Sequence, residues 1–165
     1  MAIGSVLTNT FKEELLGGYH SFNASGDTPA GSAFKIALYS ATTANIGTTT
    51  TQWVVASTPS ADPTNTLEVT TTGSGYTSGG NALTNTGVAK STVTSYTDFS
   101  DTSWTSASFT ARGCLIYNSS TISGLTTNAS VCTIDFGGDK TVSSGTFTIQ
   151  FPTNDSSSAI IRVTS

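Results

Sequence analysis

The chain offers one candidate general base, His20, beside a large supply of Ser and Thr hydroxyls. Nucleophilic catalysis by a hydroxyl requires an imidazole within hydrogen-bond reach, itself oriented by a third group. His20 lies just after Gly17-Gly18, in a stretch expected to connect two elements. A lone His in such a position is typical of a surface residue. We therefore expect no catalytic triad.

Carboxylates are the other possible source of chemistry. The stretch Asp135-Phe-Gly-Gly-Asp139 resembles the magnesium motif of kinases, but no glycine-rich phosphate loop accompanies it, and the same residues are typical of a hairpin turn. Asp98, Asp101 and Asp139 could supply loop oxygens to Ca²⁺, although such a site needs several that converge. Glu68 is the only Glu outside the expected helix, so no carboxylate pair for glycoside hydrolysis is evident. We expect no catalytic residue, metal site, cofactor or enzymatic activity.

Aromatic side chains raise the alternative of sugar binding. Trp53, Trp104 and five tyrosines could each offer a flat face on which a sugar ring stacks. The same residues also serve as core filling in a β-sandwich, because large aromatic side chains dominate the apolar area that such a core buries. We favour the core interpretation.

Charge excludes several classes of partner. Charged residues make up 10% of the chain, against about 25% in an average domain. The formal net charge is −4, and the six cations are scattered instead of clustered, which argues against nucleic-acid binding. No apolar run approaches the ~18 residues of a membrane span. The N-terminus has no basic region followed by an apolar core, so we expect no signal peptide and folding in a cytoplasm.

The two cysteines allow two interpretations. If the turn between their strands centres near Ser123, Cys114 and Cys132 lie opposite each other and a cross-strand disulfide is conceivable. Alternatively, both are reduced thiols that pack as small apolar groups. Without a secretory signal, the reduced state is favoured.

A helix is expected over residues 5–16. Leu7, Phe11 and Leu15 recur at intervals of four and form one apolar stripe, with Ser5 as a possible N-cap and Gly17-Gly18 as the stop. A helix of about three turns is marginal alone in water, so the stripe must pack on the chain's own sheet or on another chain. We treat residues 1–18 as an N-terminal helical arm.

The remaining residues, 19–165, are expected to form one β-sandwich domain. The block 104–151 contains three runs typical of strands, 106–117, 130–136 and 146–151, with a turn over 137–145 between the last two. Further strands are expected over residues 34–39, 52–57, 66–70, 81–89, 91–99 and 159–163. Short strands separated by turn residues at this spacing predict an all-β, antiparallel sandwich, jelly-roll or immunoglobulin-like, with one short N-terminal helix.

The strand edges of this sandwich would be poorly protected. Natural sheets shield exposed edges with Lys, Pro or inward-pointing charges, and this chain has few of these. We therefore expect an assembly, a symmetric oligomer or a lattice, in which edges and flat faces are covered.

Several phrases of the sequence resemble a family of small structural proteins from the particles of tailed bacteriophages. The resemblance covers nearly the whole chain and is carried by residues 11–16, 34–39, 75–84, 101–118 and 135–152. It implies a virion protein assembled in the host cytoplasm, most plausibly a capsid decoration or cement protein on the outside of the head. Such proteins are often β-sandwich trimers. The family motifs imply no catalytic residue.

The resemblance also implies partners. These would be the major capsid protein and further copies of the chain, with neither nucleic acid nor membrane. The alternative is a head-fibre, tail or receptor-contacting component, which glycan binding through Trp53 or Trp104 would support. If the chain is a decoration protein, we expect Leu7, Phe11 and Leu15 to form part of the interface with the capsid or with a sister subunit.

Overall fold

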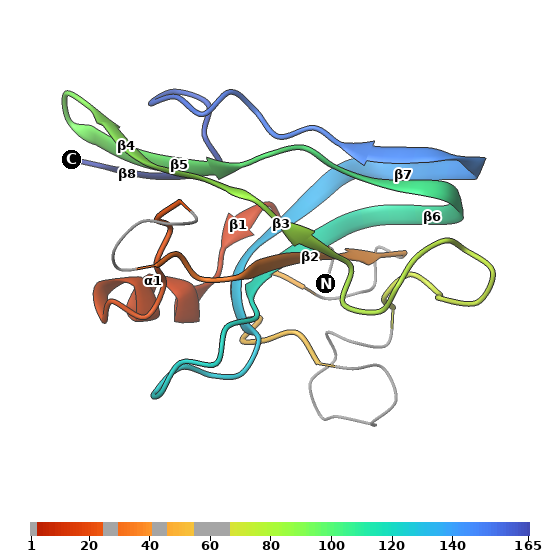
Figure 1. Cartoon of the computed structure of the whole chain (residues 1–165), viewed down its shortest axis with the longest axis horizontal. Coiled ribbons are helices and arrows are strands. Elements are labelled where there is room, and N and C mark those ends of the chain that lie inside the picture. The colour runs from red at the N-terminus through yellow and green to blue at the C-terminus, as the bar shows by residue number, and fades with distance from the viewer. Residues whose placement is uncertain (1–2, 25–29, 41–45, 55–66) are drawn as a thin grey trace.

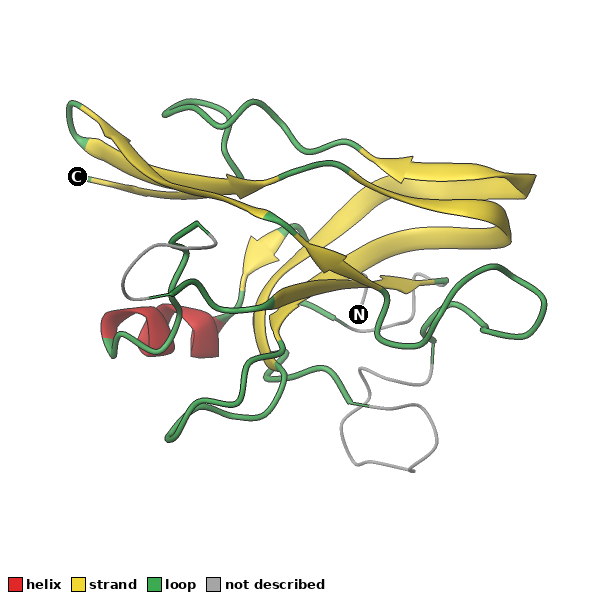
Figure 2. Cartoon of the chain, in the orientation of Figure 1, coloured by secondary structure: helices red, strands yellow, loops and turns green. Residues whose placement is uncertain are grey.

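Two antiparallel sheets pack against each other, and one short helix lies beside them (Figures 1 and 2). The computed structural model describes residues 3–24, 30–40, 46–54 and 67–165. The expected all-β sandwich with a single N-terminal helix is confirmed. Among the residues that the structure describes, no helix is long and apolar enough to cross a membrane.

The dominant feature is a ribbon of two long strands, β6 (Thr102–Asn118) and β7 (Ala129–Ile149). They pair antiparallel along their whole lengths, from Thr102 opposite Ile149 to Asn118 opposite Ala129. The sequence predicts two strands separated by a turn over residues 137–145. That prediction is wrong, because these residues belong to β7, and the pairing of β7 with β6 resumes at Lys140 after an irregular stretch over residues 136–139.

The turn-like residues of 137–145 instead bend the ribbon. The pairing of β6 with β7 is interrupted at four places, three of them between Trp104 and Gly113. Ser106, Gly137 and Ser144 adopt positive φ of 52°, 71° and 49°. Bulges of this kind bend strands and let them pass from one layer of a sandwich to the other. Figure 1 shows the ribbon curving between the two layers at one end of the molecule.

The larger sheet has five strands in the order β1-β7-β6-β2-β3, and the smaller has three in the order β4-β5-β8. The prediction of a strand over residues 34–39 is confirmed by β2. The other strands are β1 (Val6–Leu7), β2 (Phe34–Tyr39), β3 (Asn81–Leu83), β4 (Asn85–Ser91), β5 (Thr94–Phe99) and β8 (Ile161–Thr164). Residues 52–54 and 67–70 contribute isolated bridges instead of the expected strands, and residues 55–57 and 66 lie outside the described ranges.

The helix α1 spans Asn9–Leu16, later than the expected start at residue 5. Val6 and Leu7 extend instead as β1 beside β7, because their backbone finds partners at Thr133 and Cys132. The N-cap is therefore Thr8, whose hydroxyl accepts a hydrogen bond from the Phe11 N–H at 3.3 Å.

The N-terminal segment belongs to the sandwich. Ile3, Thr8 and Phe11 are buried, and the Thr8 N–H donates to the Val131 carbonyl at 3.0 Å. Of the expected arm over residues 1–18, Ile3 and Phe11 join the core clusters of the sandwich, whereas Leu16 is 91% exposed.

The larger sheet is buried on both faces. Phe34, Ile36 and Leu38 of β2 face the main core between the layers, together with Cys114 and Ile116 of β6. The alternate residues of these strands join a second cluster on the opposite face, comprising Ile3, Ala37, Tyr39, Ile46, Trp53, Leu115 and Tyr117. This double burial explains the nearly continuous apolar run of β2.

Both cysteines are free and buried. Cys114 lies opposite Ile134 and Cys132 opposite Ile116, so the two thiols are diagonal neighbours and not the directly opposed pair expected from a turn centred at Ser123. Complete burial raises the pKa of the Cys132 thiol to about 12 and that of Cys114 well above its ordinary value. The interpretation as apolar core residues is confirmed.

Candidate interaction surface

His20 takes part in a buried hydrogen-bonded chain and not, as expected, in a surface loop. Its Nε2 lies 2.9 Å from a Glu14 carboxylate oxygen, and its Nδ1 lies 3.1 Å from the Asn118 amide nitrogen. Because an amide nitrogen only donates, Nδ1 accepts and the ring proton sits on Nε2. Burial lowers the pKa of His20 despite the neighbouring Glu14. Both ring nitrogens are thus used, and neither is left to activate a nucleophile.

The acidic residues do not converge. Asp98 is buried and accepts hydrogen bonds from the backbone N–H groups of Phe99 and Ile160, whereas Asp139 is exposed and lies 3.8 Å from Arg112. Asp101 accepts from the backbone N–H of Phe151. Within the described ranges, His, Cys, Asp and Glu side chains do not form a group of three that could hold a metal ion.

Glu68 is a structural anchor. Its carboxylate accepts hydrogen bonds from the Tyr76 hydroxyl at 2.7 Å, from Ser78 at 3.1 Å and from the Gly79 N–H at 2.6 Å. These bonds fix the loop before β3 against the sheet. Burial of the Tyr76 hydroxyl and, to a lesser extent, the nearby Glu68 carboxylate raise the pKa of Tyr76 far above its usual range.

Neither tryptophan presents a face to solvent. Trp53 is 8% exposed and stacks on Tyr117 with ring centroids 5.3 Å apart, and Trp104 is 4% exposed among Tyr76, Phe109 and Phe147. The interpretation of these aromatics as core filling is confirmed. A glycan has no indole face to stack on in this arrangement.

The open surface of the molecule lies along the outer edge of β7. Beside it, β1 pairs with Thr133 and Cys132, and Ser5 accepts a hydrogen bond from the Asp135 N–H. From there to Ile149, β7 has no strand partner on its outer side in the described part of the chain. An edge of this length is a template for another strand.

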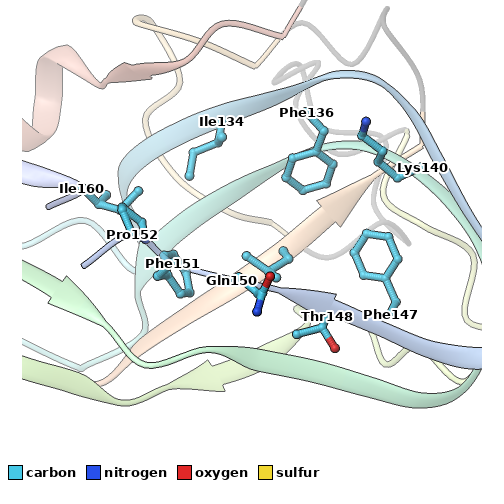
Figure 3. Close-up of a pocket in the computed structure, with 10 residues that line it drawn as sticks. Ile134, Phe136, Lys140, Phe147, Thr148, Gln150, Phe151, Pro152 and Ile160 are labelled. Atoms are coloured by element: carbon cyan, nitrogen blue, oxygen red, sulfur yellow. The ribbon is translucent and has the colours of Figure 1, made fainter. Parts of the chain in front are cut away.

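An apolar groove of about 550 Å³ follows this edge (Figure 3). Figure 3 shows side chains from both arms of the bent β7 around it, with Ile134 and Phe136 on one arm and Phe147 on the other. The segment after β7 closes one end. The full lining is Ile134, Phe136, Lys140, Phe147, Thr148, Ile149, Gln150, Phe151, Pro152 and Ile160.

A second hollow of about 300 Å³ continues the groove toward the N-terminal segment. The two share Ile134 and Ile160, and the second also includes Leu7 and Cys132. Several lining side chains, among them Ile134, Phe136, Phe147 and Ile149, also pack on the main core while remaining partly exposed. The groove is therefore the place where the core of the sandwich opens to solvent.

The three expected interface residues are not brought together on one surface. Phe11 is 0% exposed, so the expectation that it contacts a partner is corrected: its ring packs 5.0 Å from His20 and 6.0 Å from Phe22 in the core. Leu15 packs on the core and stays partly exposed. Leu7 lines the second hollow, and a contact through it remains a prediction.

Three valines of the smaller sheet are also exposed. Val88 of β4, Val93 at the hairpin tip and Val163 of β8 are 59%, 63% and 57% exposed. Figure 2 shows this sheet extending past the helix toward the C-terminus.

Sequence patterns contain part of the signal for the groove. The alternation of Phe147, Ile149 and Phe151 indicates a strand with one apolar face, but it does not show that the strand is an edge. The edge position follows from the strand order, which depends on long-range pairing.

Searches of family models, curated proteins and solved structures give no match.

Proposed function

We propose that the protein is a structural component of a bacteriophage virion, a capsid decoration protein that binds and stabilises the outer surface of the head. The observation that carries the proposal is the apolar groove along the unpaired edge of β7. A core that opens to solvent beside an unprotected strand edge is suited to burial in an assembly.

The charge pattern and the resemblance of the sequence support the same proposal. A net charge of −4 with scattered cations suits an outer capsid surface better than one that faces DNA. The proposed partners are the major capsid protein and further copies of the chain in a homo-oligomer. The proposed location is the virion, after assembly in the host cytoplasm.

The proposal requires no chemistry. His20 uses both ring nitrogens in buried hydrogen bonds, Glu68 anchors a loop, and Asp135 forms an ion pair with Arg112. We therefore propose a binding protein and not an enzyme. The alternative, a head-fibre, tail or receptor-contacting component, finds no support from Trp53 or Trp104, since both indoles are buried.

A mixing experiment tests the proposal. Purified protein is added to capsids prepared without it, and binding is measured by cosedimentation. We expect saturable binding at a fixed ratio to the major capsid protein. Absence of binding, together with antibody labelling at the tail, would overturn the proposal in favour of the alternative.

Two exposed variants locate the contact. Val93→Asp alters the tip of the smaller sheet, and Leu16→Asp alters the end of α1, where the side chain is 91% exposed. Both positions tolerate charge because neither contributes to the core. Capsid binding by both variants is expected if the groove makes the contact, whereas loss of binding in Val93→Asp alone assigns the contact to the tip of the smaller sheet.

A further inference from the structure

We infer that the groove beside β7 is a binding site for a single-chain amphiphile with an anionic head, of the class of a fatty-acid carboxylate. Its tail lies among the apolar side chains of the groove, and its head meets Lys140. The inference goes beyond the proposed function, because the ligand is a small molecule and not the capsid. Its test uses the chain alone, so its failure and the failure of capsid binding are measured separately.

The size of the groove suits an alkyl chain. Its volume is about 550 Å³, within the roughly 300–1,000 Å³ of small-molecule sites. A methylene group fills about as much space as a water molecule, roughly 30 Å³, so a tail of about 12 carbons occupies on the order of 360 Å³. The second hollow, of about 300 Å³, shares Ile134 and Ile160 with the groove and leaves room for a longer tail.

The groove has an apolar end and a cationic end. Figure 3 shows Ile160 and Pro152 at one end and Lys140 at the other, next to Phe136 and Phe147. Among the described residues that line the groove, Lys140 is the only charged one, and the lining of the second hollow includes none. The site is therefore polarised along its length in the same way as an amphiphile.

The ammonium group of Lys140 is available to an anion. Lys140 is exposed and forms no ion pair with any residue that the structure describes. The neighbouring carboxylates of Asp135 and Asp139 lie 3.2 and 3.8 Å from Arg112 instead. The backbone of Lys140 is held in place by its pairing with Ala111 of β6. An exposed ion pair at this position would strengthen binding modestly, by about two- to fivefold.

The lining of the groove favours an alkyl chain over a peptide segment. Apart from Lys140, its polar members are Thr148 and Gln150, and Figure 3 shows the Thr148 hydroxyl directed away from Phe136. A peptide would bury its own N–H and C=O groups against the apolar wall without partners, a cost that an alkyl chain does not have. The edge of β7 offers a peptide few backbone partners, because β1 pairs at one end and the strand is irregular over residues 136–139.

The walls of the groove are held by the core. Ile134, Phe136, Phe147 and Ile149 pack on the main core while they stay partly exposed. The ring centroid of Phe147 lies 5.1 Å from that of Phe109, and several further aromatic rings surround it. A site whose walls are already ordered loses little free energy to rearrangement when a ligand binds. The exposed part of these side chains is the area that a tail would remove from water.

The first test is isothermal titration calorimetry of the intact chain with octanoate, decanoate and dodecanoate, each below its micelle concentration. We expect one site per chain and a dissociation constant for dodecanoate on the order of 100 µM, similar to the membrane affinity of a single acyl chain. Each added methylene should tighten binding by about two- to fourfold, the upper value being that of full burial. Dodecyltrimethylammonium, which has the same tail and a cationic head, should bind at least about fivefold more weakly than dodecanoate.

The second test reverses the charge at the mouth of the groove. Lys140→Glu should bind dodecyltrimethylammonium more tightly than dodecanoate, because the side chain beside the head then attracts a cation. The matched control is Lys90→Glu, which changes an exposed cation of β4 outside the groove and should leave both affinities unchanged. Circular dichroism establishes that both variants are folded.

The third test examines the orientation of the tail. Dodecanoate with a nitroxide at its terminal carbon should broaden the amide resonance of Ile160 more than that of Lys140, because the tail points toward the apolar end.

Absence of saturable binding overturns the inference, and so does equal affinity for the two head charges. Equal effects of Lys140→Glu and Lys90→Glu also overturn it, because the head would then not lie at the mouth of the groove. Broadening that is strongest outside the groove overturns it as well. Selectivity for the anionic head that Lys140→Glu reverses, together with broadening at Ile160, supports it.

Discussion

Replacement of Phe11 by Ala should destabilise the protein severely. The ring is 0% exposed and packs between α1 and the sheet, with centroids 5.0 Å from His20 and 6.0 Å from Phe22. Truncation of a buried Phe to Ala removes its burial energy and leaves a cavity, which together cost about 3–5 kcal/mol. That is a large share of the roughly 5–15 kcal/mol that stabilises a typical domain.

The matched control is Leu16→Ala in the same helix. Its side chain is 91% exposed, so its removal should change the free energy of unfolding by no more than about 0.5 kcal/mol. The assay is urea unfolding of the two variants and the wild type, followed by far-ultraviolet circular dichroism. Equal slopes against urea concentration make the midpoints comparable.

Two results would refute the reasoning. If Phe11→Ala loses less than about 1 kcal/mol, the ring does not hold the helix to the sheet. If Leu16→Ala loses as much as Phe11→Ala, the helix contributes through its backbone and not through the buried ring. Phe11→Asp should unfold the chain, because it places a carboxylate in a fully buried position without a partner.

Three further predictions concern other buried groups. Because burial lowers the pKa of His20, the folded state binds fewer protons than the unfolded state below about pH 6.5, so stability should fall as the pH drops through this range, and less so in His20→Gln. Gly80→Ala should lower the free energy of unfolding by more than about 3 kcal/mol, measured by thermal or urea unfolding. The new Cβ would lie 1.7 Å from a backbone oxygen of β2, and φ at this position is +69°. The control, Gly47→Ala, places its Cβ more than 4 Å from any neighbouring atom and should be nearly neutral. Cys114 and Cys132 should not react with a thiol reagent until the protein unfolds, because the thiolate is the reactive form and burial raises both pKa values; rapid labelling of the native protein would contradict this.

Local patterns predict the fold class and several elements well. Residues 34–39 alternate apolar side chains and form β2, and Gly17 follows the last helical residue. The all-β class follows from short β-branched runs between turn residues. In each of these cases, the determining interactions are close in the sequence.

Long-range pairing explains where the structure differs from the elements expected from the sequence. Leu7 has helical spacing with Phe11, yet β7 provides backbone partners for Val6 and Leu7, and the helix begins at Asn9 instead of at the expected residue 5. Gly137 and Ser144 are residue types common in hairpin turns, yet β7 pairs with β6 before and after each of them, so they form irregularities within one strand and not a turn. His20 lies next to glycines but is buried, because α1 and Asn118 close over it. These outcomes depend on which segments meet, and local sequence does not encode that directly.

The central claim is that the protein acts through its open strand edge, and backbone amide exchange along β7 tests this claim most directly. Exchange is measured in dilute protein and in the assembled state, with β2 as an internal reference because it is paired on both sides. We predict that amides between Ile134 and Ile149 exchange more slowly after assembly while those of β2 do not change. Equal exchange along β7 in both states would contradict the claim.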